Sequence, residues 1–321
     1  MRQIRGLTGL VLALAGTVGA TTAQAERLTM GATYSSSPYY AYQVGMAGFL
    51  AKTVDDLQVN VRELGGGQVS TEALLRGEVD MSIAVSATDF SAMAGEKPFS
   101  APAEELRTLW YFAPTWLNFV VAADSGIASM RDLSGRHINP GGRGSSTESM
   151  VDLVLAELGI EPELVRIDGT DALEEFQNGR LDGFVKSGLL PDAYIQQAAV
   201  ARDISFVPMT DEEIDKIIAA YPYFSRADVK TEDAEFSTVQ TAVGITTTSD
   251  MSEEMAYQIA KAVFSEEGKT AAAEVYPPSK AFSAAEVTLV AAVAPLHPGV
   301  LRYFDEQGIE VPERLKAAAT Q

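Results

Sequence analysis

Hydrophobic and polar positions along the chain follow two different periods, one typical of strands and the other typical of helices. Residues 28–32 carry an apolar side chain at every second position, which predicts a strand with one buried face. Residues 151–158 instead space their apolar side chains three and four apart, which predicts a helix that ends at Gly159. Both patterns recur, so the chain is expected to combine strands and helices throughout.

The predicted strands and helices alternate in two series. The first series has strands at 28–32, 57–61 and 81–85, and helices at 42–50 and 69–75. The second series has strands at 137–139, 164–167, 181–185 and 204–207, and helices that begin near 144, 172 and 192. This alternation indicates an α/β protein, and in the first series it predicts a mainly parallel sheet.

Two further apolar segments are expected to cross between these series. Residues 109–122 are rich in aromatic side chains and have no helical period, so we interpret them as extended chain, and the β-rich residues 239–246 cross back. The remainder, from residue 249, is expected to be helical. The prediction is a hinged protein with a cleft, in which lobe I comprises residues 26–115 and 245–321 and lobe II comprises residues 116–244.

Ligands of open α/β sheets bind beyond the carboxyl ends of the strands. In this chain five loops would meet there, around one crevice. They are residues 34–40, 65–68, 86–89, 141–147 and 187–192.

The glycine-rich turn at residues 139–148 is the main candidate for an anion site. It leads into a predicted helix, whose first amides lack internal partners and carry the positive end of the dipole, so that Ser145, Ser146 and Thr147 would complete a carboxylate or phosphate site. Arg143 would add a bidentate contact to a carboxylate. In the alternative interpretation a serine merely caps the helix and Arg143 is solvated. No Gly-Lys-Ser/Thr sequence follows, so the turn is not a P-loop.

Composition and charge narrow the function classes. Residues 1–25 have two arginines, an apolar run and a small-residue site near Ala25, which predicts a cleaved export signal. The net charge is −20 and becomes −22 without these residues, which argues against nucleic-acid binding. Cysteine is absent, so disulfides and thiolate chemistry are excluded. A disulfide-free exported protein of this size is expected in a bacterial periplasm.

Catalytic motifs are absent from the sequence. The two histidines, His137 and His297, lie far apart, and neither a G-x-S-x-G elbow nor an H-E-x-x-H motif occurs. Tandem carboxylates such as Glu104-Glu105 are typical of solvated faces or helix starts. We therefore expect no enzyme activity, no metal and no cofactor. Distant carboxylates that converge in the fold would make a glycosidase or metal site, which is one alternative.

Four motifs resemble the TAXI-type solute-binding receptors of TRAP transporters, and the similarity runs through nearly the whole mature chain. These motifs are the serine-rich turn before Pro38-Tyr39-Tyr40, the stretch from Gly67-Gln68-Val69 to Gly77-Glu78-Val79-Asp80, Gly144-Ser145-Ser146-Thr147-Glu148, and Pro295-Leu296-His297-Pro298-Gly299-Val300-Leu301-Arg302-Tyr303. The chain departs from the family pattern at the first-loop serines, at Gln68 and at Arg143. These changes fall in the expected cleft and put the ligand's identity in doubt.

The resemblance implies a two-lobed, type II periplasmic-binding-protein-like fold. It also implies a monomeric receptor that captures a glutamate-like amino acid or a dicarboxylate and delivers it to a TRAP permease. A periplasmic subunit that senses the same ligand for a signalling partner is the other alternative. The ligand contacts that the resemblance implies, together with Arg143 from the turn, are Ser36, Ser37, Tyr39, Gln68, Asp89, Ser145, Ser146, Thr147, Pro191 and Asp192.

Each group in this set would have a distinct task. Hydroxyls and amides would hold a carboxylate, Tyr39 would supply a flat apolar wall, and Asp89 or Asp192 would accept from an ammonium group. Arg143 would clamp the carboxylate. On this hypothesis Arg143→Ala weakens carboxylate binding by roughly 2–4 kcal/mol, because a desolvated anion loses its charged partner.

Overall fold

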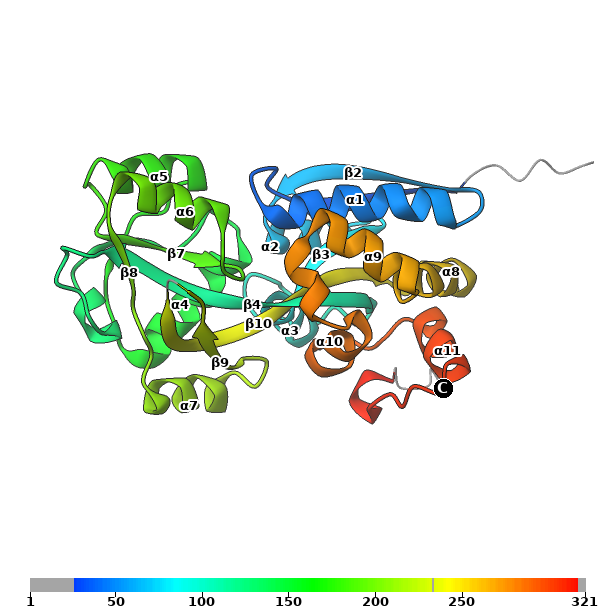
Figure 1. Ribbon diagram of the computed structural model, residues 1–321. Coiled ribbons are helices and arrows are strands. Elements are labelled where there is room, and N and C mark those ends of the chain that lie inside the picture. The colour runs from blue at the N-terminus through cyan, green and yellow to red at the C-terminus, as the bar shows by residue number, and fades with distance from the viewer. Residues whose placement is uncertain (1–25, 233, 317–321) are drawn as a thin grey trace, which may run out of the picture.

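The computed structural model describes residues 26–316 except residue 233. The predicted export signal and its cleavage site near Ala25 lie outside the described residues. Within them, two lobes lie side by side and are joined by long strands (Figure 1). No helix in this described part is long and apolar enough to cross a membrane.

Ten strands of the described residues form one continuous sheet that runs through both lobes. Its order is β2-β1-β3-β10-β4-β7-β5-β6, with β8 paired to β4 and β9 paired to β10. The strands are β1 (Glu26–Thr33), β2 (Leu57–Gly65), β3 (Met81–Val85), β4 (Leu106–Ala122), β5 (His137–Asn139), β6 (Glu163–Leu164), β7 (Gly183–Ser187), β8 (Ile204–Phe206), β9 (Ser225–Lys230) and β10 (Glu235–Thr248).

Helices follow most of these strands and cover the sheet. The α-helices are α1 (Pro38–Thr53), α2 (Gly67–Leu75), α3 (Ser86–Ala94), α4 (Ser146–Leu158), α5 (Gly169–Gln177), α6 (Ala193–Ala201), α7 (Asp211–Ala220), α8 (Glu253–Val263), α9 (Glu266–Val275), α10 (Ala284–Ala291) and α11 (Pro298–Glu306). Short 3-10 helices are η1 (Met130–Leu133), η2 (Pro277–Ala281) and η3 (Glu313–Leu315).

Parallel strand pairing places the ends of several strands at one edge. β1 pairs in parallel with β2 and β3, and β5 pairs in parallel with β6 and β7. The mainly parallel sheet predicted for the first series is confirmed by the parallel pairing of β1 with β2 and β3. The antiparallel strand in that region is β10, which pairs with β3.

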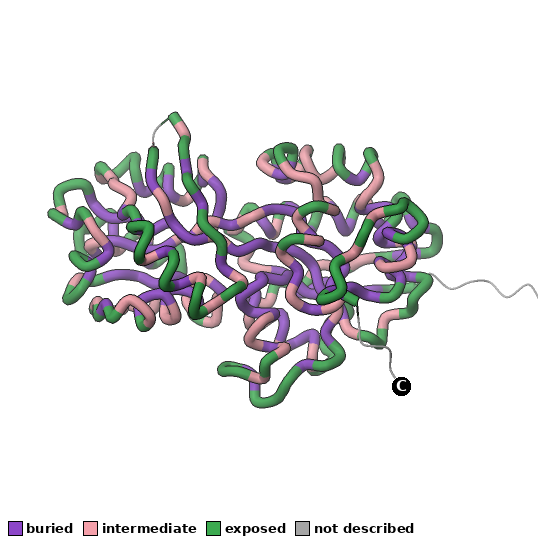
Figure 2. The backbone as a smooth tube through the Cα atoms, turned by 90° about the horizontal axis from the view of Figure 1, so that it is seen from below, coloured by how far each residue is buried: buried purple, intermediate pink, exposed green. Residues whose placement is uncertain are grey.

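The two long strands β4 and β10 are the crossings between the lobes, as predicted. Each passes from one hydrophobic core into the other, and the buried backbone in Figure 2 is continuous through this region. On β4, Ala113 belongs to the first core and Leu117 to the second; on β10, Ala242 belongs to the first and Val239 to the second. We propose that the lobes divide within these two intervals.

The structure adds elements that the periodicity did not predict. α3 and α9 are built from small or polar residues, so their sequences carry little apolar period. α7 follows the acidic run Asp211-Glu212-Glu213, where Thr210 and Glu213 form a capping box. The predicted strand at 164–167 is wrong in extent, because β6 ends at Leu164 and residues 165–167 are loop. The helical prediction for the remainder of the chain extends to residue 321, and residues 317–321 lie outside the described residues.

Candidate functional site: a cavity between the lobes

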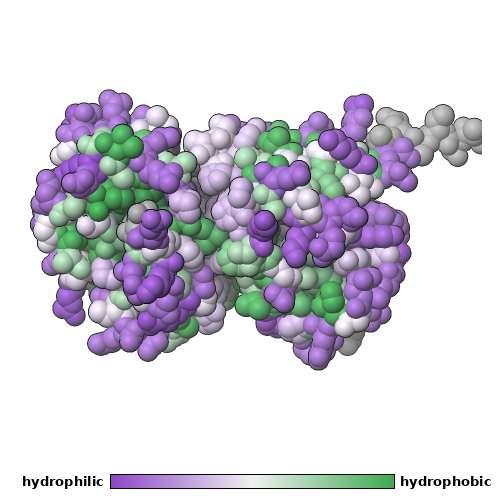
Figure 3. All heavy atoms as spheres, in the orientation of Figure 1, coloured by the Kyte–Doolittle hydropathy of each residue, from purple (hydrophilic) through white to green (hydrophobic). Residues whose placement is uncertain are grey.

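A cavity of about 1060 Å³ lies between the two lobes. Figure 3 shows the waist of the molecule at this position, with hydrophobic residues in the gap. Four of the five predicted loops contribute to its lining. The fifth prediction, residues 86–89, is wrong: these residues form the first turn of α3, where all four are buried and Ser86 donates to the Ala291 carbonyl oxygen at 2.9 Å.

Within the described residues, five helices begin at the cavity wall. The first residues of α1, α2, α4, α5 and α6 line it, because each of these helices follows a strand or loop that ends at the crevice. Helix N-termini carry partial positive charge and unpaired amides. Their convergence favours an anionic group in the cavity.

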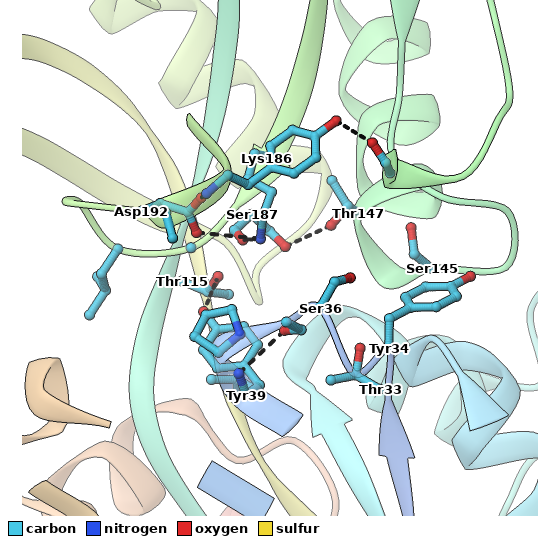
Figure 4. Close-up of a pocket in the computed structure, with 18 of the residues that line it drawn as sticks. Thr33, Tyr34, Ser36, Tyr39, Thr115, Ser145, Thr147, Lys186, Ser187 and Asp192 are labelled. Carbon is cyan, nitrogen blue, oxygen red and sulfur yellow. Dashed lines mark hydrogen bonds and ion pairs between the residues drawn. The ribbon is translucent and has the colours of Figure 1, made fainter. Parts of the chain in front are cut away.

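The start of α4 combines a helix cap with free donors. Ser145 Oγ accepts from the Glu148 amide at 3.1 Å, so this serine caps the helix, as in the alternative interpretation. Among the described residues, the Ser146 and Thr147 amides have no acceptor. Thr147 Oγ1 lies 2.6 Å from Ser187 Oγ, which joins this helix start to β7 (Figure 4). The amides and hydroxyls there can therefore bind a carboxylate.

Lys186 and Asp192 are the only charged side chains among the described residues that line the cavity. Lys186 Nζ lies 3.6 Å from Asp192 Oδ2 and donates to the Ser187 carbonyl oxygen at 3.0 Å. Asp192 Oδ1 accepts from the Tyr194 and Ile195 amides at 2.9 and 3.1 Å, which caps α6. The Asp192 side chain is 3% exposed and that of Lys186 is 23% exposed. Asp192 is thus occupied by its own protein contacts, while the ammonium of Lys186 can reach a ligand.

Arg143 does not line the cavity. Its guanidinium Nε donates to the Arg166 carbonyl oxygen at 2.9 Å, on the surface of lobe II. Its own carbonyl oxygen accepts from the Tyr34 hydroxyl of lobe I at 2.9 Å. The role of Arg143 as a carboxylate contact stays a prediction, and its side chain is placed elsewhere in this structure.

Gln68 and Asp89 also lie outside the cavity lining. Gln68 bonds with Glu72 Oε1 at 3.1 Å and accepts from Ser149 Oγ at 3.0 Å, so it links α2 with α4 across the lobes. Asp89 is fully buried and accepts from the Tyr111 hydroxyl at 2.5 Å. Burial raises the pKa of Asp89 to about 7. Its surroundings are those of a structural carboxyl group within lobe I.

The predicted residues of the first loop lie on the cavity wall, and so does Pro191 opposite. Ser36 is exposed there, and Ser37 caps α1 by accepting from the Tyr39 amide at 3.3 Å. The hydroxyl of Tyr39 donates to Thr115 Oγ1 at 3.0 Å. Burial raises the pKa of Tyr39 to about 12, so its phenol is neutral at physiological pH. Figure 4 shows these groups facing Lys186 and Ser187 across the gap.

Sequence reasoning missed Lys186 and an apolar part of the lining. The apolar residues come from β4, from the loop before α6 and from the segment around η2. They include Trp116, Leu189, Leu190, Tyr276, Pro277 and Phe282. The one sequence signal for the last group is Tyr276-Pro277-Pro278, an interruption within a segment that otherwise predicts helices.

The lobes touch beside the polar end of the cavity. A Cβ atom on Gly66 would lie 2.5 Å from the Gly144 carbonyl oxygen, and one on Gly67 would lie 2.5 Å from Ser146 Oγ. Ser146 Oγ is also 2.8 Å from Thr88 Oγ1. Glycine is therefore required at residues 66 and 67 for this approach of α2 to α4.

The two histidines have protein partners away from the cavity. His137 pairs with Glu163 at 3.0 Å at the exposed end of β5. His297 caps α11 and its Nε2 lies 3.0 Å from the Met251 carbonyl oxygen, and burial lowers its pKa. Among the described residues, no group of three or more His, Asp or Glu side chains is placed to hold a metal ion.

Several solved structures are similar to this chain in fold. A structure from a study of glutathione import through GshT and the cystine ABC importer TcyBC of Streptococcus mutans has 12% identity and a TM-score of 0.53, over 81% of this chain and 96% of that chain. An ancestral arginine-binding protein bound to arginine has 18% identity and a TM-score of 0.52, over 78% and 97%. A Xanthomonas citri protein bound to chloride ion has 12% identity and a TM-score of 0.51, over 87% and 99%.

These likenesses and the topology define a type II periplasmic-binding-protein fold, as predicted. Within that fold class the chain belongs to the NMT1-like family, which it matches over residues 30–308.

Proposed function

We propose that this protein is an exported solute-binding receptor that captures a small carboxylate-bearing solute between its lobes. The observation that carries the proposal is the position of the cavity. It lies between two lobes joined by two strands, and in the described residues its wall holds the starts of five helices and one lysine. Helix starts and a lysine are the groups that bind carboxylates in proteins.

The carboxylate is expected at the start of α4. The unpaired amides of Ser146 and Thr147 would donate to one oxygen, and the ammonium of Lys186 would approach the other. The Thr147 and Ser187 hydroxyls, 2.6 Å apart, lie between these two donors and can rotate toward the ligand. Asp192 would hold Lys186 in place through their 3.6 Å ion pair.

Closure of the lobes would couple binding of the solute to its delivery. Contacts such as Ser149 with Gln68 and Ser146 with Thr88 form only when α4 approaches α2 and α3. A solute that bridges the lobes favours this arrangement over an open one, because it contacts both walls only in the closed state. The closed form would then dock on a membrane permease.

We infer a permease of the TRAP type from the four motifs that resemble TAXI receptors. The competing class is the ABC importer, the kind of transporter that imports cystine in the Streptococcus mutans system of one structural neighbour. The two classes differ in energy source, since the TRAP resemblance implies an ion gradient and an ABC importer uses ATP.

The binding proposal is tested by thermal shift with the protein lacking residues 1–25, followed by calorimetry. A ligand at about 100 times its dissociation constant should stabilise the protein by roughly 2.7 kcal/mol. Amino acids, dicarboxylates, monocarboxylates and 2-oxoacids form the panel. Absence of a shift with every carboxylate would contradict the proposal.

The delivery proposal needs uptake measured in membrane vesicles of the source cells, with the protein and its solute added outside. Uptake should stop when the ion gradients are dissipated and persist when ATP is depleted. The opposite result would assign the receptor to an ABC importer. Binding without any uptake would favour a sensing role.

A further inference from the structure

We propose that the ligand is an amphipathic monocarboxylate, with one carboxylate at the α4 end of the cavity and an apolar body, such as an aromatic or branched chain, along the η2 side. This inference rests on the proposed carboxylate receptor and narrows its ligand class. It departs from the glutamate-like or dicarboxylate ligand that the family resemblance implies.

The charge of the cavity wall admits one carboxylate. Lys186 supplies the single positive charge of the described lining, and Asp192 offsets part of it from 3.6 Å away. A second ligand carboxylate would have no cation to face and would be repelled by Asp192. The long-range field adds to this repulsion, because the chain carries a net charge of −20.

The remaining helix starts do not provide an equivalent second site. α1 and α6 are capped by their own side chains, Ser37 and Asp192. α5 has no side-chain cap, but its N-cap residue is Asp168 and its first turn holds Asp171, so a ligand carboxylate would be repelled there. α2 begins without a side-chain cap, but its first residues lie against α4: the position of a Cβ on Gly66 is 2.7 Å from Ser145 Cα. The free amides at the starts of α2 and α4 therefore meet at one end of the cavity, where they would serve the same carboxylate.

The polar and apolar parts of the wall follow one another in a fixed order. Thr147 bonds with Ser187, the residue after Lys186, and Lys186 pairs with Asp192. Figure 4 shows Asp192 and Tyr39 on the side of the cavity away from Ser145, and Tyr276 packs against Tyr39. Beyond Tyr276 the lining continues with Pro277, Pro278 and Phe282. The anion-binding end at α4 thus leads past Lys186 to an apolar end.

The apolar end lies between both lobes. Tyr276 packs edge to face on Tyr39 with ring centroids 5.5 Å apart. Leu189, which belongs to the loop before α6 in lobe II, is buried in the core cluster of lobe I. Trp116 and Leu190 also line the cavity and pack together with the apolar cluster around β9. A ligand body placed here would contact aromatic and aliphatic carbon from the two lobes at once.

The size of the cavity agrees with a body of this kind. Pockets of about 300–1,000 Å³ bury most of a drug-sized ligand, and this cavity measures about 1060 Å³. A glutamate would occupy only the α4 end and leave the apolar wall facing water. An aryl or branched group would cover it.

The test is a matched series of ligands measured by calorimetry on the full protein without residues 1–25. The series is phenylacetate, 3-phenylpropionate and 4-phenylbutyrate, with the methyl ester of the last, and glutarate and glutamate for comparison. Affinity should rise about fourfold for each added methylene that becomes buried. Glutarate and glutamate should bind at least tenfold more weakly than 4-phenylbutyrate, and the ester should bind at least tenfold more weakly than its acid.

A variant pair locates the apolar body. Phe282→Ala should weaken 4-phenylbutyrate roughly tenfold, since it removes part of the apolar wall, and it should weaken phenylacetate less. Val290→Ala, at a side chain that is 80% exposed, is the control and should change neither. Melting of both ligand-free variants reports whether they fold.

The outcomes separate the two proposals. Tighter binding of glutarate or glutamate than of every arylalkanoate would overturn the monocarboxylate inference and keep the receptor function. If the ester binds as tightly as its acid, binding does not need a carboxylate, and both proposals are overturned. Binding of none of the probes, in a protein that melts cooperatively, would overturn the monocarboxylate inference, and the receptor proposal would fall as well if no carboxylate of the screening panel shifted the melting temperature.

Discussion

Arg143 and Lys186 both lie near the carboxylate end of the cavity, and only Lys186 lines it. Arg143 belongs to the glycine-rich turn, is exposed, and donates to the Arg166 carbonyl oxygen at 2.9 Å. Lys186 stands near the end of β7, is 23% exposed, and pairs with Asp192 on the cavity wall. Arg143 is thus next to the glycine-rich turn in sequence, but Lys186 is the cation that lines the cavity beside it.

The reason for this difference is the direction of the backbone at each position. In the turn before α4, Gly141 and Gly142 face the cavity while Arg143 does not. The charged groups of the turn are also satisfied locally: Glu148 accepts from the Gly144 amide at 2.7 Å and pairs with Arg166 at 2.7 Å. Lys186 instead lies near the end of β7, and the pairing of β7 with β4 and β5 places this end at the crevice.

Removing the Lys186 charge should have the largest effect on binding. Lys186→Met keeps the aliphatic length and should weaken carboxylate binding by roughly 2–4 kcal/mol, because a desolvated anion loses its charged partner. The measurement is calorimetry with the tightest carboxylate from the screen. Lys230→Met, an exposed lysine paired with Glu235 on the same lobe, is the matched control and should leave affinity unchanged.

The same variant leaves Asp192 buried without its cation, which should lower stability as well as affinity. The double variant Lys186→Met with Asp192→Asn removes that unpaired charge and keeps an acceptor for the cap of α6. It should melt closer to the unchanged protein than the single variant and still bind weakly. Full affinity in either variant would contradict the role of Lys186.

The sequence was sufficient for the fold and for part of the site. Strand and helix periods located β1 to β5 and most helices, because burial on one face dictates the spacing of apolar residues. The crossings were predictable since most residues of β4 are apolar. Four of the five crevice loops followed from the rule that ligands lie beyond the strand ends.

The remainder required three-dimensional information. Nothing in the sequence pattern around Lys186 distinguishes it from a solvated lysine, because its role depends on its position beside Asp192 and the helix start at Thr147. The apolar wall around Tyr276 is similar, since it lies some 130 positions after the turn and reaches the cavity only through the packing of η2. α3 illustrates the opposite error, because Asp89 follows a strand and yet is buried.

The turn that contains Arg143 lies against Gly66 of the other lobe. A substitution at Gly66 therefore tests whether this contact takes part in closure of the lobes. Gly66→Ala places a Cβ 2.5 Å from the Gly144 carbonyl oxygen, at a backbone φ of −121° that alanine tolerates. Overpacking of this kind costs roughly 1–3 kcal/mol, here only in the closed state. Affinity should fall by that amount, and the ligand-induced decrease in radius of gyration, measured by X-ray scattering, should shrink.

A glycine in open space supplies the control for this experiment. A Cβ on Gly48, within α1, would have no atom within 4 Å. Gly48→Ala should raise stability slightly, because alanine favours a helix, and should not change ligand affinity. Equal affinities for the two alanine variants would mean that the lobes do not close through α2 and α4.

The hydroxyl of Tyr34 tests the same contact with a smaller change. Tyr34→Phe removes its 2.9 Å hydrogen bond to the Arg143 carbonyl oxygen, which joins the lobes. We expect affinity to fall by about 0.5–1.5 kcal/mol, the usual net value of one hydrogen bond. Tyr40→Phe removes a tyrosine hydroxyl within α1 and serves as the control. Calorimetry on both variants gives the comparison.

Arg143→Ala should have the smallest effect. Its backbone carbonyl, which receives the Tyr34 hydroxyl, stays in place, and the lost guanidinium bond is an exposed one to Arg166. The structure therefore predicts a change in carboxylate affinity below about 0.5 kcal/mol, typical of surface substitutions, whereas the sequence alone predicts a loss of roughly 2–4 kcal/mol. Calorimetry on Arg143→Ala beside Lys186→Met decides between them: a larger loss at Arg143 would mean that its side chain swings into the cavity when the solute binds.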